Sequence, residues 1–257
     1  GCTLTKNARW AGRNTSKDTV RDDVWNALVD TGVNIGPSHS RIPNFAGADL
    51  AALNLSRVPA WQAARIVKCN PDPPQIPVRL RALYEGKIVY APVPELTEGL
   101  PFVRLDPALL DSAGVSFEVA ATSQGFQQYG VHVEFEEMEV LDFVVVGCVA
   151  VTREGGRTGK GGGFADLELG IFRELGKIGP DTQIATTVHS SQVVEDERVV
   201  MVAHDSALHW IATEQELIET KTAFPQPTGL AWDVVQPDQY RDIPFLETLR
   251  DRITGKD

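Results

Sequence analysis

Residues 141–166 have the sequence LDFVVVGCVAVTREGGRTGKGGGFAD, and this stretch decides the fold. Its apolar run, 143–151, is rich in β-branched residues and too short to cross a membrane. It therefore predicts one strand buried on both faces of a parallel sheet. Glycines follow at positions 156, 159, 161, 162 and 163, and a helical pattern begins near Phe164. A buried strand, a glycine loop and a helix start, in that order, predict an α/β fold.

Two cations, Arg157 and Lys160, lie among these glycines. Glycine lets backbone N–H groups point into one concavity, and a helix N-terminus adds partial positive charge. The loop therefore predicts an anion site with phosphate as its natural occupant, and the alternative is a solvated turn. The spacing matches neither GxxxxGK[ST] of nucleotide-binding P-loops nor GxGxxG of dinucleotide-binding folds.

The composition limits the classes of partner. The chain has 257 residues, with 24 Lys and Arg against 35 Asp and Glu, for a net charge of -11. This acidity argues against nucleic-acid binding and against binding to anionic membranes through bulk charge. The three cysteines are far apart and lack CxxC spacing, which favours a reducing compartment. We expect a cytoplasmic protein, monomeric or homodimeric, that binds a small molecule.

Three parts are expected along the chain. We expect residues 1–15 to form a loose N-terminal arm whose Arg9, Trp10 and Arg13 can fold back onto the body, and residues 16–220 to form the α/β domain. Residues 221–257 predict a C-terminal strap over the domain or a contact with a partner chain.

Within the domain, an amphipathic helix is expected from Ser16, its N-cap, to Gly32. A strand at 64–68, a helix that ends at Gly86 and a strand at 87–93 predict a βαβ unit and a mostly parallel sheet.

Two later segments carry polar side chains. A strand at 183–188 ends at His189, which places this histidine on the same sheet edge as the glycine loop. Asp205 follows in a connecting loop, where a carboxylate can hold Mg²⁺ opposite phosphates. A strand at 207–212 is then expected, with a capping box at 213–216 that begins a helix.

Residues 156–166 resemble the GxRxGxGxGYYD signature of the 5-formyltetrahydrofolate cyclo-ligase family. Residues 187–194, His204-Asp205 and the helical pair Lys17 and Arg21 are similar to further segments of that family. A closer likeness, to the methenyltetrahydrofolate synthetase domain-containing branch, is carried by residues 41–45, 121–125 and 145–151.

The resemblance implies a three-layer α/β/α fold, with a mostly parallel sheet, that uses Mg-ATP to convert 5-formyltetrahydrofolate into 5,10-methenyltetrahydrofolate. It implies catalytic roles for Arg157 and Lys160 and a Mg²⁺ ligand at Asp205. It implies substrate-binding positions at Gln75, His189 and Gln192, and ATP-binding positions at Lys17, Arg21, Arg157, Gly159, Lys160, Gly161, Gly162, Gly163, Phe164 and Asp166.

The chain departs from the signature at Phe164 and Ala165, where the family has two tyrosines. Two alternatives therefore stay open: a related ATP-binding enzyme that acts on a different small heterocycle, and a non-catalytic nucleotide-binding module that kept the fold.

Overall fold

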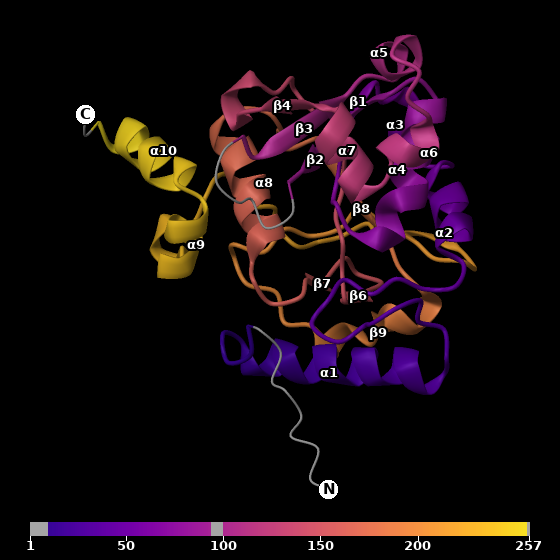
Figure 1. Ribbon diagram of the computed structural model, residues 1–257. Coiled ribbons are helices and arrows are strands. Elements are labelled where there is room, and N and C mark those ends of the chain that lie inside the picture. The colour runs from indigo at the N-terminus through magenta and orange to yellow at the C-terminus, as the bar shows by residue number, and fades with distance from the viewer. Residues whose placement is uncertain (1–9, 94–99, 256–257) are drawn as a thin grey trace, which may run out of the picture.

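The computed structural model describes residues 10–93 and 100–255 (Figure 1). In these residues an eight-stranded sheet has the order β11-β10-β8-β5-β1-β2-β3-β4. The five strands β10, β8, β5, β1 and β2 pair in parallel, while β11, β3 and β4 pair antiparallel at the two edges. The expected α/β fold with a mostly parallel sheet is confirmed. The strands span Ile66–Cys69 (β1), Ile88–Pro92 (β2), Phe102–Leu105 (β3), Val131–Val133 (β4), Phe143–Val145 (β5), Gln183–Thr187 (β8), Trp210–Ala212 (β10) and Leu217–Glu219 (β11).

Helices cover both faces of this sheet, which gives the predicted three layers. Consecutive side chains of a strand point to opposite faces. Accordingly, Phe143 and Val145 of β5 belong to one hydrophobic cluster and Val144 belongs to the other. The first cluster packs under α2 (Ala48–Leu55), α3 (Pro59–Ala63), α4 (Ile76–Tyr84), α5 (Pro107–Ser112), α6 (Phe117–Ala120) and α7 (Ser123–Tyr129). The second packs under α8 (Phe164–Glu174) and α10 (Phe245–Thr254).

The predicted βαβ unit is present as β1, α4 and β2. Strands β1 and β2 pair in parallel, with Ile66 opposite Ile88. Pro77 lies in the first turn of α4, and Gly86 follows its last residues with φ 79°, a left-handed conformation that ends the helix at little cost for glycine. The carboxyl ends of β1 and β2 therefore lie at one edge of the sheet.

The single strand expected over 143–151 is wrong, because the run divides into two strands in two sheets. Strand β5 ends at Val145, and β6 (Ala150–Thr152) joins a second sheet with β7 (Arg157–Thr158) and β9 (Val193–Val194). The chain passes close to other segments at Gly147, where a Cβ would lie 2.8 Å from Asp72 Oδ2 and 3.0 Å from Ile42 Cγ2. The apolar pattern of the sequence cannot locate the boundary between the two strands, because both strands are buried.

Helix α1 (Thr15–Asp30) covers the second sheet. Its N-cap is Asn14, whose side chain accepts from the Lys17 backbone N–H, so the cap lies two residues before the expected Ser16. Four apolar side chains of α1 pack against residues of and near the second sheet, namely Val20, Val24, Trp25 and Leu28.

The helix predicted after the capping box at 213–216 is also wrong. Thr213 Oγ1 accepts from the backbone N–H groups of Gln215 (3.1 Å) and Glu216 (3.0 Å), but these bonds close a tight turn between β10 and β11. The same hydrogen bonds from backbone N–H groups to a Thr side chain occur in turns and at helix starts. Here β11 pairs with β10, so these bonds belong to a turn.

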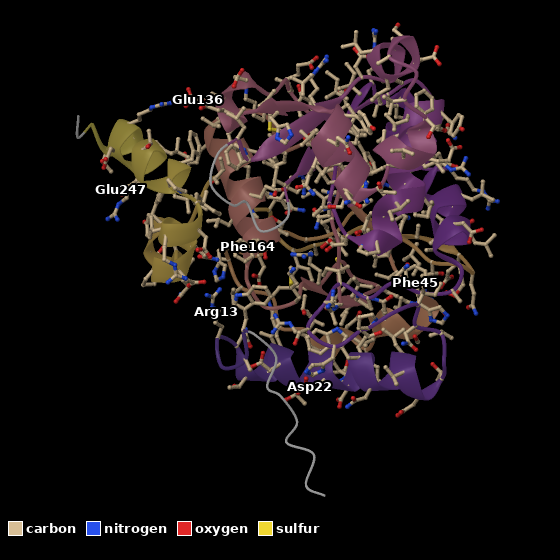
Figure 2. The ribbon with its side chains drawn as sticks, viewed as in Figure 1. Arg13, Asp22, Phe45, Glu136, Phe164 and Glu247 are labelled. Atoms are coloured by element: carbon tan, nitrogen blue, oxygen red, sulfur yellow. The ribbon has the colours of Figure 1, made fainter. Side chains whose placement is uncertain are left out.

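The C-terminal stretch contains α9 (Pro237–Asp242) and α10 and packs on the same core as α8. Ile243, Leu246 and Leu249 are buried there, and the Phe245 ring stacks on Phe135 with centroids 5.1 Å apart. Glu136 lies beside α10 and pairs with Arg252 (Figure 2). Among the described residues, no helix combines the length and the apolar character needed to span a membrane.

Candidate active site

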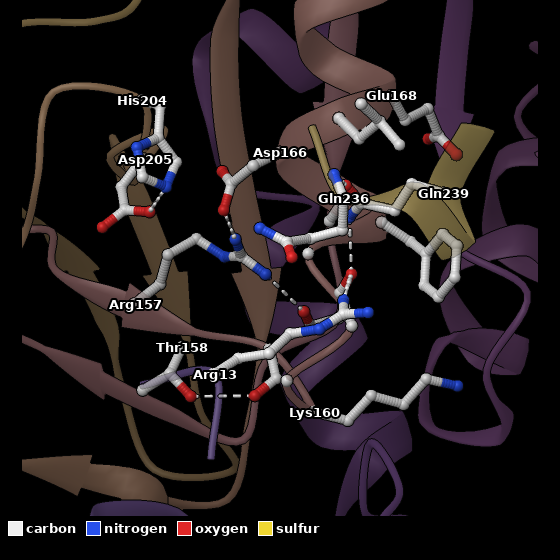
Figure 3. Close-up of a pocket in the computed structure, with 18 of the residues that line it drawn as sticks. Arg13, Arg157, Thr158, Lys160, Asp166, Glu168, His204, Asp205, Gln236 and Gln239 are labelled. Atoms are coloured by element: carbon white, nitrogen blue, oxygen red, sulfur yellow. Dashed lines mark hydrogen bonds and ion pairs between the residues drawn. The ribbon is translucent and has the colours of Figure 1, made fainter. Parts of the chain in front are cut away.

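A cavity of about 450 Å³ opens at the carboxyl edge of the large sheet. Its walls come from the start of α1, the loops after β1 and β2, the glycine loop and the start of α8. The loop 202–205 and part of the C-terminal stretch, 229–239, complete it. Segments from both ends of the chain thus meet around the glycine loop (Figure 3).

Five Lys and Arg side chains line this cavity: Arg13 just before α1, Lys17 and Arg21 from α1, Arg157 from β7, and Lys160 from the glycine loop. The four-residue spacing on α1 puts Lys17 and Arg21 on one face. Both are buried, with 7% and 6% exposure, so they are not a solvated pair. In an acidic protein, this gathering gives one local site for an anion.

Lys17 and Asp205 form a buried ion pair across the cavity wall. Lys17 Nζ lies 2.8 Å from Asp205 Oδ2, which also accepts from the Val202 backbone N–H at 3.0 Å. His204 Nε2 lies 3.7 Å from the other carboxylate oxygen. The carboxylate expected to face a metal ion therefore already neutralises a lysine.

Arg21 binds the start of the glycine loop through its guanidinium group. Its Nε donates to Thr158 Oγ1 at 3.0 Å and to the Gly159 carbonyl at 2.7 Å, and its NH1 pairs with Asp18 at 3.0 Å. Burial lowers the pKa of Arg21, and Asp18 opposes this effect. These bonds position the start of the glycine loop on α1.

Arg157 is almost completely buried and is fixed on three sides. Its Nε contacts Cys148 Sγ at 3.3 Å, its NH2 donates to the Gly147 carbonyl at 3.1 Å, and its NH1 pairs with Asp166 at 3.3 Å. Burial acts to lower the pKa of Arg157, but Cys148 and Asp166 outweigh it, so the pKa is raised. The guanidinium is therefore a permanent positive charge beside the first turn of α8.

The glycine loop requires glycine at its turn. Gly161 and Gly163 have φ of 114° and 71°, backbone conformations that residues other than glycine rarely adopt. At Gly162, a Cβ would lie 2.7 Å from the Phe164 ring and 3.0 Å from Trp10. Gly163 is the N-cap of α8, so the loop ends where the helix dipole favours an anion.

Trp10 and Arg13 fold back over this loop, as the sequence suggested for both residues. The Trp10 ring meets the Phe164 ring edge-on at 5.8 Å, and Lys160 Nζ lies 5.3 Å from the centre of the Trp10 ring. Arg13 NH1 donates to the Gly162 carbonyl at 2.8 Å. Arg9, which the sequence also suggested for this role, lies outside the described residues.

Two further carboxylates, Asp72 and Glu168, line the cavity, and neither was a predicted site residue. Glu168 is buried and forms an ion pair with Lys68 of β1. Burial raises the pKa of Glu168 against the opposing charge of Lys68, and burial likewise raises the pKa of Asp72 against Lys160. Two features of the sequence could have indicated these carboxylates. Glu168 interrupts the apolar side of its helix, and Asp72 follows the carboxyl end of a parallel strand.

The three predicted substrate-binding residues do not line this cavity. Gln75 is buried, with its Nε2 3.5 Å from Thr187 Oγ1. His189 does lie at the carboxyl edge of the sheet, but its Nε2 is 3.4 Å from Glu214 Oε2. Gln192 Nε2 donates to the carbonyls of Cys148 and Val149, at 3.2 and 3.1 Å, and so ties the second sheet together. The predicted ATP-binding residues, in contrast, all line the cavity together with Asp205.

The cations and hydrogen-bond donors of the cavity fit a nucleoside triphosphate. Five cations, glycine amides and a helix N-terminus match the charge and hydrogen-bonding needs of phosphate oxygens. Residues 10–93 and 100–255 contain no group of three or more His, Cys, Asp or Glu side chains that could hold a metal ion. Mg²⁺ commonly binds through phosphates with only one or two carboxylates, so Asp205 still suits a nucleotide-bound ion.

Comparisons with known proteins identify the family. The sequence model of the 5-formyltetrahydrofolate cyclo-ligase family matches residues 13–214. Proteins called methenyltetrahydrofolate synthase domain-containing protein are similar over 249 residues and 94% of this chain, with 37% identity in Mus musculus and 35% in Bos taurus. This chain spans 66% and 64% of their respective lengths.

A solved structure is also similar, the NMR structure of Aquifex aeolicus 5,10-methenyltetrahydrofolate synthetase. It has 19% identity and a TM-score of 0.49, over 80% of this chain and 95% of that one. The family match covers most of the chain, including the cation-lined glycine loop. The chain belongs to the 5-formyltetrahydrofolate cyclo-ligase family, a family of ligases of folate metabolism.

Proposed function

We propose that the protein catalyses the ATP-dependent cyclisation of 5-formyltetrahydrofolate to 5,10-methenyltetrahydrofolate, with release of ADP and phosphate. The observation that supports it most is the convergence of Lys17, Arg21, Arg157 and Lys160 on one cavity at the start of α8. Because the protein is acidic as a whole, these cations serve a local anion, and a triphosphate has the charge that they can neutralise.

In the proposed reaction, the formyl oxygen attacks the γ-phosphate and ADP leaves. N10 then attacks the formyl carbon and loses its proton, and the carbon–oxygen bond breaks to release phosphate as the ring closes. The protein contributes mainly positioning and charge neutralisation, which are the principal terms in phosphoryl transfer.

The two catalytic cations, Arg157 and Lys160, differ in burial, and we assign them different roles. Arg157 is fixed by Asp166 and the Gly147 carbonyl, so it presents a charge that does not need to reorganise during the reaction. Lys160 is less buried, and we assign it to the transferred phosphoryl group. Mg²⁺ would lie on the nucleotide near Asp205, where it would neutralise phosphate charge.

The substrate side of the signature differs from that of the family. Phe164 packs against Trp10, and Ala165 supplies neither a ring nor a hydroxyl. This difference supports the second candidate, an ATP-using enzyme of the same family that acts on a different small heterocycle.

The test is the formation of methenyl absorbance from Mg-ATP and 5-formyltetrahydrofolate by the purified protein. Lys160→Gln should reduce kcat by about 10²-fold, as expected when one charge contact to a transition state is removed. Lys221→Gln, which changes an exposed lysine outside the cavity, is the matched control. Bound ATP without methenyl formation would refute the cyclo-ligase, and ADP release with another heterocycle would then support the second candidate.

A further inference from the structure

The C-terminal stretch 229–239 lines the cavity, although the family model matches only residues 13–214. We propose that this stretch, here named the C-terminal wall, is the surface against which the ring of the second substrate packs, with Val234 as its contact residue. The inference rests on the proposed function, because it assigns the second substrate to one end of the same cavity.

The C-terminal wall is part of the folded domain and is anchored on α8. The Leu230 backbone N–H donates to Glu174 Oε1 at 2.8 Å. Next to it, α8 has a glycine at position 170, where a Cβ would lie 2.6 Å from Leu230 Cδ1 and 3.2 Å from Leu230 Cα. Just before the wall, the Gln226 side chain forms two hydrogen bonds with the backbone of Ala207, of 3.0 and 2.9 Å. The wall therefore has a defined position before any ligand binds.

The side chains of the wall that line the cavity are mainly apolar. Leu230 and Val235 also pack against the core that lies under α8. Val234 lines the cavity, is 38% exposed and is not among the residues packed against that core. Pro92 and Val93, at the carboxyl end of β2, contribute further apolar surface. An apolar wall in a polar cavity is the usual surface for a ring.

Charge separates this end of the cavity from the phosphate end. Figure 3 shows His204 and Asp205 on one side of Arg157, and Glu168 with Gln239 on the other. Asp72 is close enough to Glu168 for its charge to add to the rise in the pKa of Glu168, whose main cause is burial. At the other end, Asp166 and Asp205 pair with Arg157 and Lys17, cations that line the cavity themselves. Lys68, the partner of Glu168, does not line the cavity. Carboxylates repel phosphate oxygens, so the end next to the C-terminal wall suits the substrate that carries no phosphate.

A direct link sets the distance between the two ends. Gln239 Nε2 donates to the Gly162 carbonyl at 2.8 Å, the same carbonyl that accepts from Arg13. Arg13 in turn pairs with Asp238. The C-terminal wall is thereby tied to the glycine loop, and a ring on the wall lies at a set distance from a phosphate on the loop. Such fixed positioning is the main demand of a reaction between two bound substrates.

The test is Val234→Trp, which places an indole in the cavity from a residue that the core does not use. Binding of 5-formyltetrahydrofolate and of Mg-ATP is measured separately by calorimetry. We expect the Kd for 5-formyltetrahydrofolate to rise by about tenfold or more and the Kd for Mg-ATP to change by less than about twofold. Val140→Trp is the matched control, since Val140 is 62% exposed and lies outside the cavity lining. Val234→Ala, which adds no bulk, should weaken folate binding by a smaller factor.

Unchanged folate binding in Val234→Trp, or a loss of Mg-ATP binding in its place, would overturn the inference even if the wild type turns the substrate over. If the wild type binds 5-formyltetrahydrofolate without turnover and Val234→Trp loses that binding, the proposed function fails and the inference stands. A wild type that does not bind 5-formyltetrahydrofolate overturns both.

Discussion

Gly170→Ala tests whether the C-terminal wall is truly seated on α8. Gly170 lies inside this helix, where alanine is normally favoured over glycine by about 0.8 to 1 kcal/mol. An added Cβ would lie 2.6 Å from Leu230 Cδ1, which can move, but also 3.2 Å from Leu230 Cα, which is backbone. The substitution must therefore displace the wall itself.

The two effects oppose each other, and their sizes decide the sign. Overpacking a well-filled contact typically costs about 1 to 3 kcal/mol, which exceeds the gain in helix propensity. We expect Gly170→Ala to reduce the free energy of unfolding by about 1 kcal/mol and to lower Tm by about 2 to 4 °C. Urea unfolding followed by circular dichroism measures the first quantity, and a thermal melt measures the second.

The control is the same substitution in a Leu230→Ala background. Shortening Leu230 removes the nearest atom, so Gly170→Ala should be less destabilising there, and the double-mutant cycle isolates the contact between the two positions. Stabilisation by Gly170→Ala in the otherwise wild-type protein would refute the seating of the wall on α8.

Three further predictions concern buried ionisable groups. Lys17→Met should destabilise the protein by about 3 to 5 kcal/mol in urea unfolding, because it leaves Asp205 as an unpaired buried charge, and adding Asp205→Leu should recover part of the loss. Burial raises the pKa of Cys69 to about 11, so iodoacetamide at pH 8 should label this thiol, as read by mass spectrometry, only after unfolding. The pKa of Glu168 is raised from 4.5 by burial, so its protonated form adds stability at low pH, and this contribution is lost as the pH rises through the folded pKa. The free energy of unfolding of the wild type relative to Glu168→Gln should therefore fall as the pH rises above about 4.5, and a pH-independent difference would contradict the effect of burial on this carboxyl.

The glycine loop shows how far local sequence reaches. Glycines with left-handed φ, two cations and the start of α8 are neighbours in the chain, so their joint placement follows from backbone geometry alone. The βαβ unit follows from short-range periodicity for the same reason. The sequence by itself therefore determined the α/β class and the glycine-loop side of the cavity.

The other side of the cavity was decided only by the tertiary structure. Asp72, Glu168 and Gln239 meet there although about 70 to 170 positions separate them in the chain. Gln75, which the resemblance placed near the folate pocket, is instead buried outside the cavity lining, and no local signal shows in which direction a buried polar side chain points. Contacts of this kind form only when separate layers pack, because each residue's own neighbours place no constraint on which distant surface it will face.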